Sequence, residues 1–195
     1  MLNKSIYETD FIVIDLETTG ISPYKGAKIV EIAALKIEKG LKINPKNSFY
    51  SLVNPLIPIP YSAYRVHKIS NEIVKDYPTI EKVLPKFLEF LDTPFIIGQN
   101  ISFDYSFIKY FSDLYNFRLK EFIIIDTINI AKKIAPNLKR YNLDNLITYF
   151  GIENILGNGK RHRADFDIYA TALIFIKSIE IIENYKIDLK ISDLI

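Results

Sequence analysis

The chain has 195 residues, 49% of them hydrophobic and 25% charged, and its 25 basic against 23 acidic residues leave a formal net charge of only +2. This length and balance are typical of a globular domain with its own core, and they exclude a disordered chain. The lack of cysteine excludes a disulfide scaffold and a zinc or iron site with cysteine ligands. So small a net charge predicts no general attraction to polyanions, so nucleic-acid binding would require local patches or metal ions.

The sequence contains no segment typical of export or of a membrane span. The first ten residues include three charged side chains and lack the apolar run of a signal peptide. The longest uncharged stretch, between Lys46 and Arg65, is interrupted by three prolines, which break a helix. We therefore expect a cytoplasmic protein that makes no membrane contact.

Three strands are predicted at the start of the chain. Apolar runs cover residues 11–16, 28–39 and 49–53, and glycine-containing segments at 20–26 and 40–47 are predicted to be turns. The proline-rich stretch after the third strand is predicted to be an irregular loop.

From Thr79 onward, apolar residues recur at helical spacing, and short strands alternate with helices. The predicted elements are, in order, a helix capped by Thr79, a strand over 94–98, a helix capped by Ser102, a strand over 122–125, a helix limited by Pro136, a helix over 142–150 and a helix over 168–182. This order predicts an α/β fold, a mixed sheet with helices on both faces. We interpret residues 1–195 as a single domain with a core over about 10–183 and a short tail over 184–195.

The segment Asp15-Leu16-Glu17-Thr18-Thr19-Gly20 follows the first predicted strand. Residues i and i+2 of an extended chain point to the same side, so Asp15 and Glu17 present two carboxylates together and Leu16 faces the other way. An Asp-x-Glu pair alone is more often a solvated strand end than a metal site. The full segment, with two threonines and a glycine, is expected by chance in roughly one chain of this length in ten thousand.

Two further segments place polar side chains at the start of helices. In the segment 98–104, Asp104 falls in the first turn of a helix, where the helix dipole favours a carboxylate and where a purely structural charge is also common. In the segment 162–168, His162 follows a glycine-rich basic loop, and Asp165 and Asp167 lie at the start of the last helix. A histidine in such a loop favours a function more than a histidine on an apolar face does.

Together these segments resemble the DnaQ-like 3'-to-5' exonucleases of the DEDDh type, the family of the proofreading epsilon subunit of bacterial DNA polymerase III. The first two segments are similar to its first two motifs, and the spacing of His162 and Asp167 is similar to its third. The subsidiary segments Val66-His67-Lys68-Ile69-Ser70, Asp126-Thr127 and 141–146 fall in the expected order between them. The chain departs from the family pattern at Gln99, where histidine is frequent, and at Asp165, where leucine is frequent.

The resemblance implies a ribonuclease H-like fold, a mixed five-stranded sheet that brings four carboxylates to one point. It implies that these carboxylates hold two divalent cations, Mg²⁺ or Mn²⁺, and the implied ligands are Asp15, Glu17, Asp104 and Asp167. It also implies that His162 acts as general base, which suits imidazole because its ordinary titration lies near neutral pH. The family spacing selects Asp167 over Asp165.

Substrate contacts are predicted at several further positions. The predicted set is Thr18, Thr19, Val66, His67, Asn100, Phe103, Lys160, Arg161 and Arg163. The basic residues are assigned to phosphate attraction, with a solvated loop as an equal alternative. Val66 and His67 are assigned to stacking or wedging against terminal bases, with packing of their own loop as an equal alternative.

The leading interpretation is a metal-dependent exonuclease that releases nucleoside 5'-monophosphates from single-stranded or frayed DNA 3' ends, in proofreading or repair. An exoribonuclease resembling ribonuclease T or oligoribonuclease is the main alternative, because the sugar preference is not encoded in these motifs. An idle nucleic-acid-binding module is the third. A DNA polymerase subunit or a sliding clamp is an expected partner, docked by apolar residues of the tail 184–195.

Overall fold

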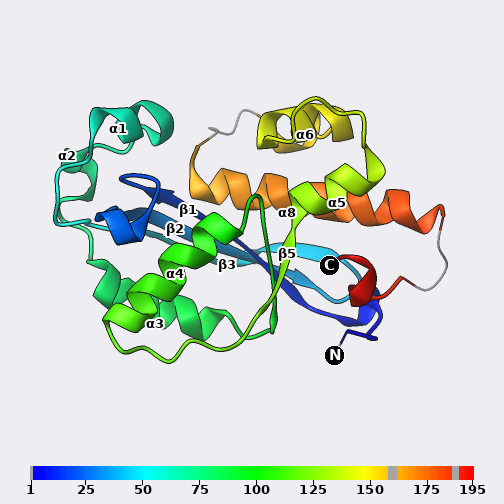
Figure 1. Cartoon of the computed structure of the whole chain (residues 1–195), viewed down its shortest axis with the longest axis horizontal. Helices are drawn as coiled ribbons and strands as arrows, with labels where there is room; N and C mark the ends of the chain where they lie inside the picture. The colour runs from blue at the N-terminus through cyan, green and yellow to red at the C-terminus, as the bar shows by residue number, and fades with distance from the viewer. Residues whose placement is uncertain (1, 158–161, 186–188) are drawn as a thin grey trace.

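The computed structural model of the chain describes residues 2–157, 162–185 and 189–195 (Figure 1). A five-stranded sheet lies at its centre, with the strands in the order β3-β2-β1-β4-β5. The strands are β1 (Phe11–Thr18), β2 (Ile29–Glu38), β3 (Lys42–Leu52), β4 (Phe95–Gly98) and β5 (Ile123–Asp126). The β1–β2 and β2–β3 pairs are antiparallel, and the β1–β4 and β4–β5 pairs are parallel. The predicted mixed five-stranded α/β fold is confirmed.

Eight α-helices and three short 3₁₀ helices are found among the described residues. The α-helices are α1 (Tyr61–His67), α2 (Asn71–Val74), α3 (Ile80–Phe90), α4 (Ser102–Leu114), α5 (Thr127–Ile134), α6 (Leu143–Phe150), α7 (Glu153–Leu156) and α8 (Ala164–Glu183). The 3₁₀ helices are η1 (Ile6–Glu8), η2 (Pro23–Lys25) and η3 (Ile191–Asp193). None of the helices in the described part of the chain is both long enough and apolar enough to cross a membrane.

The helices cover the two faces of the sheet, with α3 and α4 on one face and α5 and α8 on the other (Figure 1). Alternate residues of β1 point to opposite faces, so Phe11 and Val13 pack toward α8, whereas Ile12 and Ile14 pack toward α3 and α4. The central strand is therefore apolar on both sides until its polar end at Asp15 and Glu17.

Two sequence predictions about the first half of the chain are wrong. Residues 42–47 belong to β3 and are not a turn. The sequence does not predict a strand at these residues because β3 is an edge strand with mostly exposed side chains, and it therefore lacks an alternating apolar pattern. The proline-rich stretch before Arg65, predicted as an irregular loop, contains the start of α1, whose short length leaves little helical periodicity to detect. The helix α2 lies beyond that stretch and is not predicted from the sequence.

The predicted helix caps are also only partly correct. Thr79 is the N-cap of α3, but its side chain makes no capping hydrogen bond. Ser102 is the first residue of α4, and the N-cap is Ile101.

The C-terminal residues pack onto the same domain as the rest of the chain. Leu189, Ile191 and Leu194 are buried in the cluster between the sheet and α8. The Ile191 amide donates to the Lys4 carbonyl (3.2 Å), and the two ends of the chain lie side by side (Figure 1). These three buried residues are therefore not the exposed apolar docking residues that the sequence predicts, whereas Tyr185 and Ile195 are exposed.

Candidate active site

The end of β1 supplies two carboxylates on one face of the sheet. Asp15 and Glu17 continue the alternation of Phe11 and Val13 and so point toward α8, whereas Leu16 packs in the cluster on the opposite face. The β1–β2 register is interrupted directly after Glu17, which pairs with Glu31. Such bulges re-aim side chains at the end of a strand, which suits a site at this place.

The start of α8 supplies the opposite wall of the site. Asp167 lies in the first turn of this helix and is almost completely buried. His162 precedes the helix and has a left-handed backbone conformation (φ 60°), which is uncommon for a residue other than glycine. The conformation turns the chain into α8 and leaves the imidazole facing β1.

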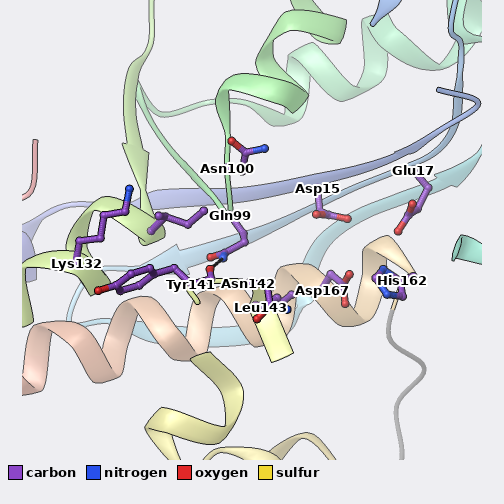
Figure 2. Close-up of a pocket in the computed structure, with 11 residues that line it drawn as sticks. Asp15, Glu17, Gln99, Asn100, Lys132, Tyr141, Asn142, Leu143, His162 and Asp167 are labelled. Carbon is purple, nitrogen blue, oxygen red and sulfur yellow. Dashed lines mark hydrogen bonds between the residues drawn. The ribbon is translucent and has the colours of Figure 1, made fainter. Parts of the chain in front are cut away.

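Glu17, His162 and Asp167 converge, and each offers one ligand atom within 4.8 Å of the others. These three side chains and Asp15 line an open pocket of about 570 Å³ between β1 and the start of α8 (Figure 2). Carboxylate oxygens and imidazole nitrogens are donors suited to Mn²⁺, and carboxylates to Mg²⁺. The described residues therefore fit a divalent cation at this point.

Asp104 reaches the same strand from the other face of the sheet. It is buried in the first turn of α4, and its Oδ1 accepts a hydrogen bond from the Leu16 amide (2.9 Å). Burial raises the pKa of Asp104 to about 8, against the opposing effect of the backbone hydrogen bonds. Asp104 thus bonds to the residue that follows Asp15 in the sequence, but it is not among the residues that line the pocket. Its predicted role as a metal ligand stays a prediction.

Asp165, the rival to Asp167, points elsewhere. It lines a separate cavity with residues of β2, β3 and α8, whereas Asp167 lines the pocket with Asp15 and Glu17. Asp165 also does not cap α8, because its Oδ1 accepts only from the neighbouring Phe166 amide.

The two threonines of the first segment stabilise the turn after β1. The Thr18 hydroxyl donates to the Gly20 carbonyl (2.7 Å), and the Thr19 hydroxyl accepts from the Lys28 amide (2.9 Å). Both side chains are buried, so in this conformation they shape the turn next to Glu17, and their predicted substrate contact stays a prediction.

The predicted stacking residues differ in exposure. Val66 is exposed on α1, beside the exposed rings of Tyr61 and Tyr64. His67 is 2% exposed, and its Nδ1 accepts a hydrogen bond from the Ile69 amide (2.9 Å). Burial lowers the pKa of His67, and a buried ring offers no face to a base, so stacking by His67 does not fit this structure.

The remaining predicted substrate residues divide into three groups. Asn100 is exposed and lines the pocket, and Phe103 is half-buried next to Phe107. Lys160 and Arg161 lie outside the described residues. Arg163 forms an ion pair with the buried Glu31 (2.7 Å) while its side chain remains 31% exposed, and its predicted contact with phosphate stays a prediction.

The pocket also contains residues that were not singled out from the sequence as site residues. These are Gln99, Ile128, Lys132, Tyr141, Asn142 and Leu143. The Gln99 amide donates to the Tyr141 carbonyl (2.6 Å) and joins β4 to the segment before α6. Lys132 on α5 and Tyr141 lie near each other along the wall (Figure 2). Only the resemblance of the segment 141–146 pointed to this wall, because α5 and α6 reach the pocket by tertiary packing.

A mixed sheet that carries carboxylates at the end of its central strand, facing a histidine and a carboxylate of the last long helix, defines a ribonuclease H-like α/β protein with an acidic site. Residues 12–175 match the family model described as Exonuclease, RNase_T. The chain belongs to this exonuclease family, as its three segments predicted.

Relatives and a solved structure agree with this assignment. A DNA polymerase III PolC-type protein of Caldanaerobacter subterraneus subsp. tengcongensis is 39% identical over 178 residues, which are 91% of this chain and 12% of that protein. A DNA polymerase III subunit epsilon of Aquifex aeolicus is 35% identical over 179 residues, which are 92% of this chain and 85% of that protein. The structure of exonuclease X in complex with 5' overhanging duplex DNA has a TM-score of 0.71 at 27% identity and covers 94% of this chain and 98% of that chain. This chain thus spans a small part of the PolC-type relative and most of the other two.

Proposed function

We propose that this protein is a metal-dependent 3'-to-5' exonuclease that releases nucleoside 5'-monophosphates from DNA 3' ends. The observation that carries the proposal is the convergence of Glu17, His162 and Asp167 in one open pocket with Asp15. Membership of the exonuclease family supports the same reaction class.

The proposal assigns a role to each residue of the pocket. Asp15, Glu17 and Asp167 hold two divalent cations, with Asp104 as the fourth carboxylate. When bound, these cations would neutralise the clustered negative charge, activate the attacking water and stabilise the departing oxygen. A ring nitrogen of His162 accepts the proton of the attacking water, which frees the oxygen to attack the terminal phosphodiester.

The rest of the pocket suits the 3'-terminal nucleotide. The pocket volume of about 570 Å³ lies within the range of small-molecule sites and is larger than the volume that a single cation occupies. Asn100 offers an amide for hydrogen bonding, and Lys132 offers a positive charge to a phosphate. Val66 and the neighbouring tyrosines of α1 offer exposed surfaces on which a base can stack.

The test is digestion of matched single-stranded DNA and RNA, labelled at the 5' end, with Mg²⁺, Mn²⁺ or EDTA. We expect a ladder that shortens from the 3' end with either metal and not with EDTA. Asp167→Ala should lower the rate by at least about 100-fold, and Asp165→Ala should retain it, because Asp165 lines a different cavity. Faster digestion of RNA than of DNA would show that RNA is the preferred substrate. No digestion of either polymer by the intact protein would contradict the proposal.

We also propose association with a DNA polymerase, since the relatives named above are a PolC-type polymerase and an epsilon subunit. Co-purification of the full chain with the replicative polymerase of the same organism should recover a complex. Recovery of the nuclease alone at micromolar concentrations of both proteins would contradict this part of the proposal.

A further inference from the structure

Glu31 is a charged residue with no exposed surface, and it lies outside the pocket. Its carboxylate accepts three hydrogen bonds, from β3 and from the start of α8, and it forms an ion pair with Arg163. Oε1 accepts from Arg163 Nε (2.8 Å) and from the Tyr50 hydroxyl (2.6 Å), and Oε2 accepts from the Ala164 amide (2.8 Å). Arg163 Nη2 forms the ion pair with Oε1 at 2.7 Å. Such a set of donors compensates for the burial of a charge, which is otherwise very unfavourable.

Tyr50 closes this group of side chains. Its hydroxyl donates to Glu31 and accepts from Arg163 Nη2 (2.6 Å), so each of the three side chains contacts the other two. Burial, and next the hydrogen bond to Glu31, raises the pKa of Tyr50, which keeps the phenol protonated as a donor. We refer to Glu31, Tyr50 and Arg163 as the Glu31 clamp.

The clamp holds the two segments that make the active site. Glu31 lies directly opposite Glu17 in the β1–β2 ladder, so its backbone is fixed to the strand that carries Asp15 and Glu17. Arg163 and Ala164 are the two residues after His162 and lie four and three residues before Asp167, respectively. The Ala164 amide is one of the first-turn donors that a helix leaves without an internal partner, and Glu31 satisfies it where the N-cap side chain makes no capping bond.

We infer that the Glu31 clamp positions His162 and Asp167 against Glu17, and that Arg163 acts through its bonds to Glu31 and Tyr50 as a positioning residue and not as a phosphate contact. This inference rests on the proposed function. It assigns Glu31 and Tyr50, which do not line the pocket, an effect on catalysis through the geometry of the site. A guanidinium suits the role because its rigid fork donates from Nε to Glu31 and from Nη2 to the Tyr50 hydroxyl at the same time, an arrangement that a lysine ammonium does not reproduce.

The central experiment compares Arg163→Lys with the wild type on DNA of increasing length. We expect kcat to fall by about 10- to 100-fold, as is usual when a residue that orients metal ligands is changed, with KM for DNA and its dependence on salt unchanged. Arg118→Lys, at an exposed arginine, is the matched control and should change neither constant. A raised KM with a weaker salt dependence and an unchanged kcat would show a phosphate contact and would overturn the inference.

A second set of variants separates positioning from folding. Glu31→Gln combined with Arg163→Gln removes both charges, so that no buried charge is left without its partner. This double variant should retain a cooperative thermal transition near that of the wild type and still show the lowered kcat. Tyr50→Phe, at a half-exposed position, should give a smaller loss of kcat in the same direction. Wild-type kcat in a stably folded double variant would overturn the inference.

Two readouts do not require nuclease activity. In protein without metal, Arg163→Lys should speed hydrogen exchange of the amides in the first turn of α8, and with Mn²⁺ it should raise the metal concentration that half-saturates the increase in melting temperature. If the wild type digests no nucleic acid, the proposed function fails while these readouts still test the clamp. Unchanged exchange and unchanged Mn²⁺ saturation in Arg163→Lys would overturn the inference whether or not the wild type is active.

Discussion

At the scale of single residues, polar side chains near the site differ in whether they bond inside the protein or face the pocket. His67 and Glu31 are buried and bond inside the protein, whereas Asn100 is exposed at the pocket. In the sequence, each of these three polar residues has an apolar neighbour, so the local pattern does not distinguish them. Their different tasks depend on what packs over them.

His67 should make the stability of the protein depend on pH. Burial lowers its pKa below the ordinary value of about 6.5, so between these values the unfolded chain binds a proton that the folded chain does not. The contribution of the buried, neutral His67 to the free energy of unfolding is therefore complete above about pH 6.5 and is lost as the pH falls toward the pKa in the folded protein. Urea unfolding at pH 5 to 8 should show a smaller loss in His67→Asn, whose side-chain oxygen can replace Nδ1 as the acceptor for the Ile69 amide.

His162→Ala is the matched control, because the chain contains only two histidines. It should retain the loss of stability at low pH. An equal loss in wild type and His67→Asn would contradict the assignment to His67.

Gly98 is required at the end of β4 by a close contact. A Cβ at this position would lie 2.7 Å from Cδ1 and 3.0 Å from Cβ of the buried Ile101. We expect Gly98→Ala to lower the free energy of unfolding by about 1–3 kcal/mol through overpacking. Gly20→Ala should cost less, because its Cβ would meet Ala27 at an ordinary 3.4 Å. Equal urea midpoints for the two variants would refute this explanation.

At the scale of elements, the site forms where β1, α4 and α8 meet. β1 contributes Asp15 and Glu17, α8 contributes Asp167, and α4 brings Asp104 to the Leu16 amide from the opposite face. β1 and α8 therefore add negative charge to one region of the fold, and α4 adds a carboxyl group whose raised pKa favours its neutral form. A region of this kind is stabilised when cations bind to it.

Divalent cations should therefore stabilise the folded protein. Mg²⁺ or Mn²⁺ at about 100 times its dissociation constant adds about 2.7 kcal/mol, which for a chain of this size is roughly 5–10 °C in melting temperature. Asp15→Asn combined with Asp104→Asn should lose this increase. The control pair Asp76→Asn and Asp113→Asn, at exposed positions, should retain it, and an increase that survives in the first pair would argue against the site.

At the scale of the whole molecule, the last residues of the chain complete the core between the sheet and α8. Ile191 is fully buried there, whereas Ile195 is 53% exposed. We expect Ile191→Ala to lower the free energy of unfolding by about 2–5 kcal/mol, and Ile195→Ala to change it by less than about 0.5 kcal/mol. Urea unfolding monitored by circular dichroism measures both, and a minor effect of Ile191→Ala would restore the view of the tail as a separate segment.

The sequence alone was sufficient for the class of fold and for the first strand of the site. The period of two in β1 places Asp15 and Glu17 on one face, and the helical spacing in α4 and α8 predicts those helices, because periodicity reflects burial of one side of an element. The spacing of His162 and Asp167 identified the third segment through a resemblance to a family. These features are local, so they can be recognised within one segment without knowing which other parts of the chain pack against it.

Only the tertiary structure decided which residues meet. Leu16 and Asp104 are separated by 88 positions in the sequence, and Glu31 and Arg163 by 132. Packing of helices on the sheet brings each pair together, and no pattern within either segment encodes that contact. For the same reason, the sequence does not show that Arg163 bonds to a buried carboxylate, that the ring of His67 is buried, or that Leu189, Ile191 and Leu194 pack in the core. The physical cause is that burial of a polar or apolar side chain depends on the surface that another part of the chain places over it.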